Sequence, residues 1–336
     1  MITLPIIWYL IICLELALYV LLDGANLGVG IVSLFPQQES KRASMLTILG
    51  PIWNANETWL LVAAGTLFGA FPAVYSIGLN ALYLPGVIIL IGLILRAVSF
   101  EFHAFSVHKR PWSFAFGLGS LITAIGHGAA LGGLLSGIAV VDGHFAGGPL
   151  SWATPLTGII IVGVVASYLV LGYAYLIRRM AYENQHETFS RLLTTVGITF
   201  VALAIATLFL PVQNFLFFTR WVEPPSMYYL TAIAVGIVIA SAFLLHAVIR
   251  HRHAERLYPL ALIIFGLGFV GMLVGTYPYL MPPSITLFDA ASPHNTLVFM
   301  LWGIGPILPI VLLYNIYLSR VFRSDAHEVR ANAYDI

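Results

Sequence analysis

Long apolar runs alternate with short polar segments along the whole chain. Nine of these runs are long enough to cross a bilayer as a helix, which takes about 20 residues. The boundary between the second and third runs depends on Asn80 and on length. We expect a single transmembrane domain over residues 1–336, all-α and polytopic, with nine transmembrane helices. Their expected spans are residues 6–33, 58–80, 81–100, 114–140, 155–177, 192–216, 228–249, 258–280 and 296–319.

Composition supports a membrane protein. Of the 336 residues, 60% are hydrophobic and only 9% are charged, and the mean hydropathy is +0.94. A soluble domain has about 25% charged residues, so this chain cannot cover itself with a surface suited to water. The net charge of +1 and the lack of a basic patch argue against binding to nucleic acid. The one cysteine, Cys13, excludes an intrachain disulfide and makes a thiolate metal site implausible.

The positions of the basic residues predict the orientation. All of the 15 Lys and Arg residues except Arg96 and Arg220 follow an odd-numbered span. The positive-inside rule therefore places the N-terminus outside and the C-terminus in the cytoplasm. The first apolar run has no basic residues before it and no small-residue cleavage site, so we expect an uncleaved first helix rather than a signal peptide.

Function must lie among the helices, because the longest hydrophilic connections are about 15 residues. They cover residues 34–48, 101–113 and 178–191 and the tail after Ser319. No Walker motif, dinucleotide fingerprint or repeat of fixed period is present. Pro72, Pro211, Pro306 and Pro309 are expected to kink or end helices.

Ionisable residues inside membrane helices are expensive and usually functional. The first span carries Glu15 near its middle, and Asp23 and Asn26 in its cytoplasmic half. Gly24 and Gly28 in the same stretch have the small-xxx-small spacing that allows close helix packing.

The second span begins with the polar segment 50–59, which contains Asn54, Asn56 and Glu57. One interpretation is a capped helix start with Glu57 in the first turn and an interfacial belt of Trp53 and Trp59. The other is a polar, hydrated cytoplasmic entrance that includes Asp23, Asn26, Asn54 and Glu57.

The third span ends with Arg96 and Glu101 at the same expected depth. An arginine there could extend its head group to the interface, or it could form a buried pair with Asp23, Glu57 or Glu101. His127 and His246 are the histidines inside expected spans, but their depths differ. Packing or hydrogen bonding therefore explains them better than haem ligation.

Four segments together resemble subunit II of bd-type quinol oxidases, with matching order and spacing. They are Leu-Asp-Gly-Ala-Asn-Leu-Gly-Val-Gly at 22–30, Gly-Pro-Ile-Trp-Asn-Ala-Asn-Glu-Thr-Trp-Leu at 50–60, Leu-Phe-Gly-Ala-Phe-Pro-Ala-Val-Tyr at 67–75 and Leu-Arg-Ala-Val-Ser-Phe-Glu-Phe at 95–102. Some details are similar to the cyanide-insensitive branch. We expect the helices to form two four-helix bundles plus one peripheral helix.

The resemblance implies a multi-pass protein of the bacterial inner (cytoplasmic) membrane. It implies a haem-free, non-catalytic chain that forms a heterodimer with a haem-bearing subunit I, within a complex that oxidises quinol and reduces O₂ to water. Haem b and haem d, or a b-type haem in its place, are expected in the partner and none in this chain. The resemblance leaves open whether the complex binds a structural quinone or lipid and whether it includes a small single-helix subunit. It also leaves open whether the substrate is ubiquinol or menaquinol.

The resemblance also implies that this subunit contributes a proton path in some members of the family, and this chain departs from the family motifs at two positions. The motifs commonly have aspartate where this chain has Asn26 and Asn54, and an amide cannot take up and release a proton at accessible pH. The expected polar cluster is Asp23, Asn26, Asn54, Glu57, Arg96 and Glu101. If a proton channel runs through this chain, its titrating members must be Asp23, Glu57, Glu101 or Glu15. Alternatively, the route is non-essential here and protons reach the oxygen site through subunit I. Two alternatives are a stand-alone secondary transporter or channel, and an assembly factor without a stable place in the enzyme.

Overall fold

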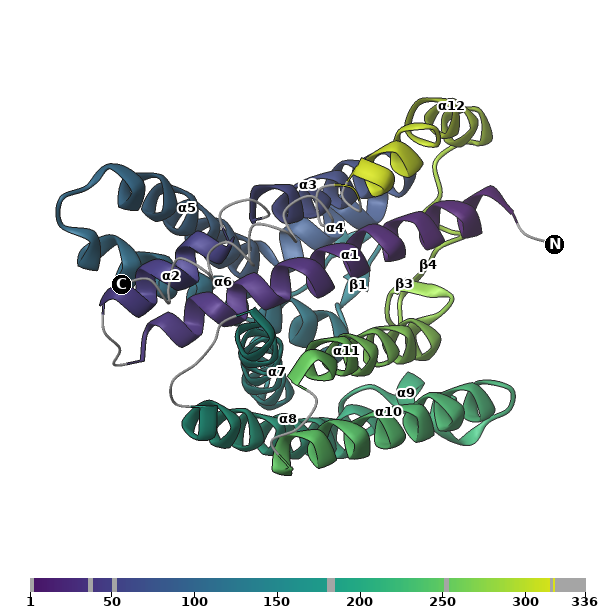
Figure 1. Ribbon diagram of the computed structural model, residues 1–336. Coiled ribbons are helices and arrows are strands. Elements are labelled where there is room, and N and C mark those ends of the chain that lie inside the picture. Colours follow the sequence, from purple (N-terminus) through teal and green to yellow (C-terminus); the bar gives the residue numbers. More distant parts are fainter. Residues whose placement is uncertain are drawn as a thin grey trace.

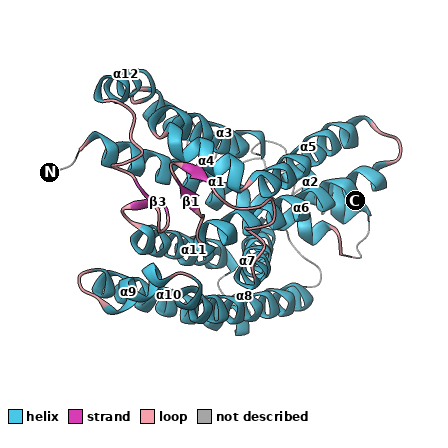
Figure 2. Ribbon diagram, turned by 180° about the vertical axis from the view of Figure 1, so that it is seen from behind, coloured by secondary structure: helices cyan, strands magenta, loops and turns pink. Residues whose placement is uncertain are grey.

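The computed structural model of the chain describes residues 3–35, 39–49, 53–179, 185–250, 254–314 and 317, without the side chains of residues 53, 54, 185 and 186. The described residues are almost entirely helical (Figure 2). The helices are α1 (Leu4–Ser33), α2 (Glu39–Leu49), α3 (Trp53–Ala70), α4 (Pro72–Ala81), α5 (Tyr83–Phe105), α6 (Lys109–Ser136), α7 (Pro155–Arg179), α8 (Gln185–Gln213), α9 (Phe215–Val222), α10 (Ser226–Ile249), α11 (Ala254–Thr276) and α12 (His294–Ile304).

Helix α1 is the central element. It packs against α3, α6 and α7, with smaller contacts to α2, α11 and α12. In Figure 1 it runs across the middle of the molecule, with α3, α4 and α5 on one side and α7, α8, α10 and α11 on the other. Any polar group on its inner faces is therefore enclosed by other helices.

Eight helical segments in the described part of the chain are long and apolar enough to cross a membrane, judged by length and composition. They are α1, α5, α6, α7, α8, α10, α11 and the segment His294–Tyr314 that contains α12. The polytopic all-α class is confirmed, whereas the count of nine spans and the two four-helix bundles stay predictions.

The expected second span, 58–80, is two helices rather than one. Helix α3 ends at Ala70 and α4 begins at Pro72, with Phe71 between them at φ −138° and ψ 63°. Proline lacks an N–H and its ring clashes with the preceding turn, so Pro72 favours a kink or break in the helix at this point. Pro72 instead occupies the first turn of α4, where its fixed φ suits a helix start. The expected boundary near Asn80 is confirmed, because α4 ends at Ala81 and α5 begins at Tyr83.

The helix break is closed by a loop from the other end of the chain. The backbone N–H of Ser292 donates to the Ala70 carbonyl at 2.9 Å, and its hydroxyl donates to the Gly69 carbonyl at 2.7 Å. These two carbonyls have lost their helical partners at the break. The segment before α12 thus supplies donors to two carbonyls that the helix break leaves without helical partners.

Small folded elements lie in connections that the hydropathy pattern leaves as loops. Helix α2 lies between α1 and α3, and buries Met45, Leu46 and Leu49. Its Arg42 donates to the Ser33 carbonyl at 2.9 Å, and its Glu39 accepts from the Ser113 hydroxyl at 2.6 Å. The antiparallel hairpins β1–β2 (Val140–Val141, His144–Phe145) and β3–β4 (Tyr279–Met281, Ile285–Thr286) and helix α9 lie toward the other end of the molecule (Figure 1).

Candidate functional site: a buried charged cluster at α1

The inner face of α1 carries its polar residues in one line. Glu15, Tyr19 and Asp23 follow one another at four-residue intervals, and all three are buried. Residues four apart lie on one face of an α-helix, separated by about 6 Å along its axis. Asn26, which is 1% exposed, extends the line by a further turn.

Close packing against α7 encloses this part of α1. A Cβ atom added to Gly28 would overlap the carbonyl oxygen of Tyr168, and one added to Gly172 would overlap the backbone of Gly28. A Cβ on Gly24 would press on the Tyr168 ring. The small-residue spacing of Gly24 and Gly28 therefore serves helix packing, as the sequence suggests.

Arg96 on α5 forms the centre of the charged cluster. Its Nη1 donates to Asp23 Oδ2 at 3.0 Å and its Nη2 donates to Asp23 Oδ1 at 3.2 Å. Both side chains are 0% exposed. This two-point geometry is the strongest pairing that a guanidinium makes with a carboxylate, and it offsets part of the cost of burying both charges. The predicted buried pairing of Arg96 is confirmed for Asp23.

Glu57 on α3 is the second acid at Arg96. Its Oε1 lies 3.0 Å from Arg96 Nη1, and its side chain is 17% exposed. The pair is close, but Oε1 has no hydrogen bond of good geometry. Two carboxylates therefore share one guanidinium, and Glu57 is the member of the three that reaches the surface of the chain.

Asn26 joins the cluster through Asp23. Its Nδ2 donates to Asp23 Oδ1 at 3.2 Å, whereas its own Oδ1 is buried and unpartnered. On the other side of the guanidinium, Phe116 of α6 places its ring centre 5.6 Å from Arg96 Cζ. Arginine over an aromatic face is a favourable arrangement, so the cluster is held from α1, α3, α5 and α6.

A histidine between two tyrosines lies next to the cluster. Tyr19 Oη is 3.0 Å from His127 Nε2, and Tyr168 Oη is 3.2 Å from His127 Nδ1. A neutral imidazole has one N–H donor and one acceptor nitrogen, so one tyrosine donates to the ring and the other accepts from it. Both ring nitrogens are thus engaged, and His127 has none free to bind a haem iron. His246 is exposed.

Glu15 lies two helical turns from Asp23. It is 0% exposed, its Oε1 accepts from the Thr66 hydroxyl of α3 at 3.1 Å, and its Oε2 has no partner. Thr66 is itself 1% exposed. A carboxyl group is therefore enclosed near the middle of the longest helix.

The structure brings together four of the six predicted cluster residues: Asp23, Asn26, Glu57 and Arg96. Glu101 is exposed and is not a partner of Arg96. The side chain of Asn54 lies outside the described residues, as do residues 50–52. Asn56 is 7% exposed.

Sequence reasoning missed Tyr19, Tyr168 and Thr66 as members of this region. The four-residue spacing of Glu15, Tyr19 and Asp23 is a signal that points to Tyr19. Tyr168 and Thr66 lie in ordinary apolar runs, and nothing in the sequence distinguishes them.

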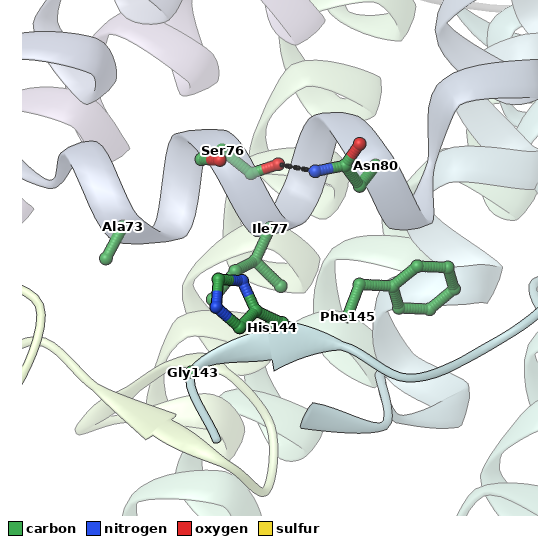
Figure 3. A pocket seen from close by; sticks show the side chains of 7 residues that line it. All are labelled: Ala73, Ser76, Ile77, Asn80, Gly143, His144 and Phe145. Atoms are coloured by element: carbon green, nitrogen blue, oxygen red, sulfur yellow. Dashed lines mark hydrogen bonds between the residues drawn. The ribbon is translucent and has the colours of Figure 1, made fainter. Parts of the chain in front are cut away.

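A shallow pocket at the opposite end of the molecule is a second candidate (Figure 3). It has a volume of about 360 Å³ and lies between α4 and the β1–β2 hairpin. Its polar groups are exposed, and the Asn80 amide that borders it donates within its own helix to the Ser76 carbonyl at 3.0 Å. No charged side chain is among its lining residues, which are Ala73, Ser76, Ile77, Asn80, Gly143, His144 and Phe145. The charged cluster is the stronger candidate.

Comparison with known proteins agrees with the resemblance in the motifs. The chain is 25% identical to cytochrome bd-I ubiquinol oxidase subunit 2 of Escherichia coli K12, over 92% of this chain and 91% of that protein. It is 27% identical to cytochrome bd ubiquinol oxidase subunit 2 of Bacillus subtilis 168, over 94% of this chain and 95% of that protein. The fold matches a chain of the bd oxidase from Geobacillus thermodenitrificans with a TM-score of 0.76 at 19% identity, covering 96% of this chain and 99% of that one.

The alignment to the family as a whole spans nearly the full chain. It covers residues 4–322 and therefore includes every helix of the charged cluster. This extent leaves the transporter interpretation without support. The chain belongs to the family of cytochrome bd terminal oxidase subunit II.

Proposed function

We propose that this chain is the haem-free second subunit of a quinol:oxygen oxidoreductase, and that its charged cluster forms part of a proton path from the cytoplasmic side. Family membership over residues 4–322 supports the subunit assignment. The observation that supports the path is the arrangement of two buried acids on one buried guanidinium, with Glu57 partly exposed.

The haem groups belong to the partner in this proposal. Haem b, with haem d or a second b-type haem, would supply the electron transfer and oxygen chemistry from subunit I. In this chain His127 does not fit the role of an axial ligand, because both of its ring nitrogens are hydrogen-bonded to tyrosines. The residues described here instead hold helices together and bind protons.

The role of each cluster residue follows from its contacts. Glu57 exchanges protons with water at the entrance of the path, since its side chain is more exposed than those of Asp23 and Arg96. Arg96 fixes the position of Asp23 through two hydrogen bonds. When Glu57 takes up a proton, Asp23 still balances the guanidinium, so uptake leaves no unpaired buried charge.

The distribution of basic residues supports the direction of this path. The Lys and Arg residues that follow odd-numbered spans predict that the connection between α1 and α3, which contains α2, lies on the cytoplasmic side. Glu57 lies in the first turns of α3 and is therefore expected near that side. The N-terminus would then face outside and the C-terminus the cytoplasm, in a bacterial inner membrane. Asn26 and Asn54 do not titrate, so Asp23 and Glu57 are the acids that the cluster itself offers to this path.

The test uses the intact complex purified from its membrane. Glu57→Gln and Asp23→Asn should each lower quinol oxidase turnover several-fold while the haem content stays normal. Ser44→Ala is a suitable control, because Ser44 is exposed on α2 and its hydroxyl bonds the Ser40 carbonyl of the same helix. Full turnover in both acid variants would leave the chain with a structural role alone.

Co-purification tests the subunit assignment separately. The native chain should purify in equal amounts with a haem-bearing subunit whose spectrum shows the haem absorbance. A colourless homo-oligomer would contradict the assignment, and a haem-bearing partner in large excess over this chain would favour an assembly factor. Ubiquinol and menaquinol are the candidate substrates of the complex.

A further inference from the structure

Unpartnered polar atoms gather along one seam of the molecule. We use the name α1 seam for Glu15, Tyr19, Asp23 and Asn26 of α1, with Glu57, Trp59 and Thr66 of α3 and Arg96 of α5. Nine buried side-chain N or O atoms lack a hydrogen-bond partner in the described residues, and five of them lie in this seam. They are Glu15 Oε2, Asn26 Oδ1, Glu57 Oε1, Trp59 Nε1 and Arg96 Nε.

Such a concentration calls for a common explanation. An unpaired polar atom in a protein interior is costly, and more so at membrane depth, so native proteins pair nearly all of them with protein groups or internal water. A site needs room and two to four polar partners to hold a water molecule. The α1 seam supplies donors at Trp59 and Arg96 and acceptors at Glu15, Asn26 and Glu57. The seam therefore has the chemistry of a water-filled polar track.

Glu15 is at the inner end of this seam. Glu15 accepts a hydrogen bond from the Thr66 hydroxyl. In the described part of the chain, no cation lies within ion-pair distance of the Glu15 carboxyl group. A carboxylate at this depth with one hydroxyl partner would be poorly compensated, whereas a carboxylic acid accepts from Thr66 at one oxygen and donates from the other. The geometry thus suits a group that binds a proton.

Tyr19 connects the two ends of the seam. It lies one helical turn from Glu15 and one from Asp23, and it packs in one cluster with Trp59. Its hydroxyl is held by His127, which is in turn held by Tyr168. Because these groups form a chain of hydrogen bonds, the Tyr19 hydroxyl can change from donor to acceptor without losing its partner.

We propose that Glu15 holds a proton at the inner end of a hydrated path that runs from the Asp23–Arg96–Glu57 cluster along α1. This inference rests on the proposed function and extends it to a residue outside the cluster. An excess proton passes along hydrogen-bonded water from Glu57, past Tyr19, to the carboxylate of Glu15. There an O–H bond forms at Oε2 as the last water gives up its proton, and no electron is transferred.

Infrared difference spectra of the intact complex, oxidised minus reduced, test this proposal together with quinol oxidase turnover. The wild type should show a protonated-carboxyl C=O band that shifts in D₂O, and Glu15→Gln should remove it and lower turnover several-fold. Glu15→Asp should restore part of both. Ser241→Ala is the matched control, because Ser241 Oγ is also buried and unpartnered but lies on α10, outside the seam.

A second variant keeps the test valid if Glu15→Gln fails to assemble. Thr66→Val removes the hydroxyl that donates to Glu15, so the carboxyl band should move in frequency while Thr66→Ser leaves it in place. An unchanged carboxyl band in an assembled Glu15→Gln complex, or in Thr66→Val where Glu15→Gln does not assemble, would overturn the proposal for Glu15.

The two proposals fail in different ways. If Glu15→Gln keeps the wild-type band and turnover while Glu57→Gln slows the enzyme, the cluster carries protons but Glu15 does not. If Glu57→Gln and Asp23→Asn also leave turnover unchanged, the proton path itself is wrong.

Discussion

Arg96 and Asp23, 73 positions apart in the sequence, form a two-point ion pair that is completely enclosed between α5 and α1. The pair links α1 to α5, and Glu57 of α3 contacts the same guanidinium. It therefore joins three helices as well as forming the charged core of the candidate site.

Replacing Arg96 by lysine should destabilise the complex. Lysine keeps the charge but loses the planar fork that bonds both oxygens of Asp23. Arg96→Gln should cost more, about 3–5 kcal/mol, because it leaves two buried acids without a cation. Thermal unfolding of the purified complex, followed by its haem absorbance, measures both. Equal melting temperatures for the wild type and Arg96→Gln would show that the pair does not support the fold.

Gly28→Ala should weaken the packing of α1 on α7. The added methyl group meets the Tyr168 carbonyl, which is backbone and cannot move aside without shifting a helix. Overpacking of this kind costs about 1–3 kcal/mol. Gly158→Ala on α7 is the control, because a Cβ there has nothing within 4 Å. Denaturant or thermal unfolding should separate the two variants, and equal stability would contradict the close approach of α1 and α7.

Ser292→Ala should destabilise the break between α3 and α4. The change removes the hydroxyl that donates to the part-buried Gly69 carbonyl, and a hydrogen bond of this kind contributes about 0.5–1.5 kcal/mol. Hydrogen exchange of the amides around Phe71 should rise in this variant. Thr47→Val on α2 is the control, since its exposed hydroxyl bonds the Ala43 carbonyl of its own helix, far from the break in sequence. If exchange near Phe71 does not change, the loop before α12 does not stabilise the break.

The sequence predicts the long helices because apolar runs of 20 residues or more have few other solutions in a membrane. It does not predict α2, whose three buried apolar residues fall within a mostly polar segment. The hairpins are also missed, because strands of two or three residues carry too little alternation to be recognised. The break at Phe71 is visible in advance through Pro72, but its closure by Ser292 depends on a contact between residues 223 positions apart.

The candidate site shows the same division. Asp23, Glu57 and Arg96 are conspicuous because charges are rare in these helices, and their shared depth is correctly inferred from topology. Glu101 shares that depth but lies five residues beyond Arg96, about 140° around the helix, and so points away from α1. Depth can be read from the sequence, whereas the direction of a side chain needs the packing of α5 on its neighbours.

We infer that Glu57 and the Asp23–Arg96 pair carry protons toward the interior of the complex. The most direct test is proton uptake, followed with a pH indicator in solution, when the fully reduced complex reacts with O₂. In Glu57→Gln we expect proton uptake to slow by the same factor as turnover, with normal haem content and an unchanged rate of O₂ binding. Proton uptake at the wild-type rate in this variant would contradict a proton path through Glu57.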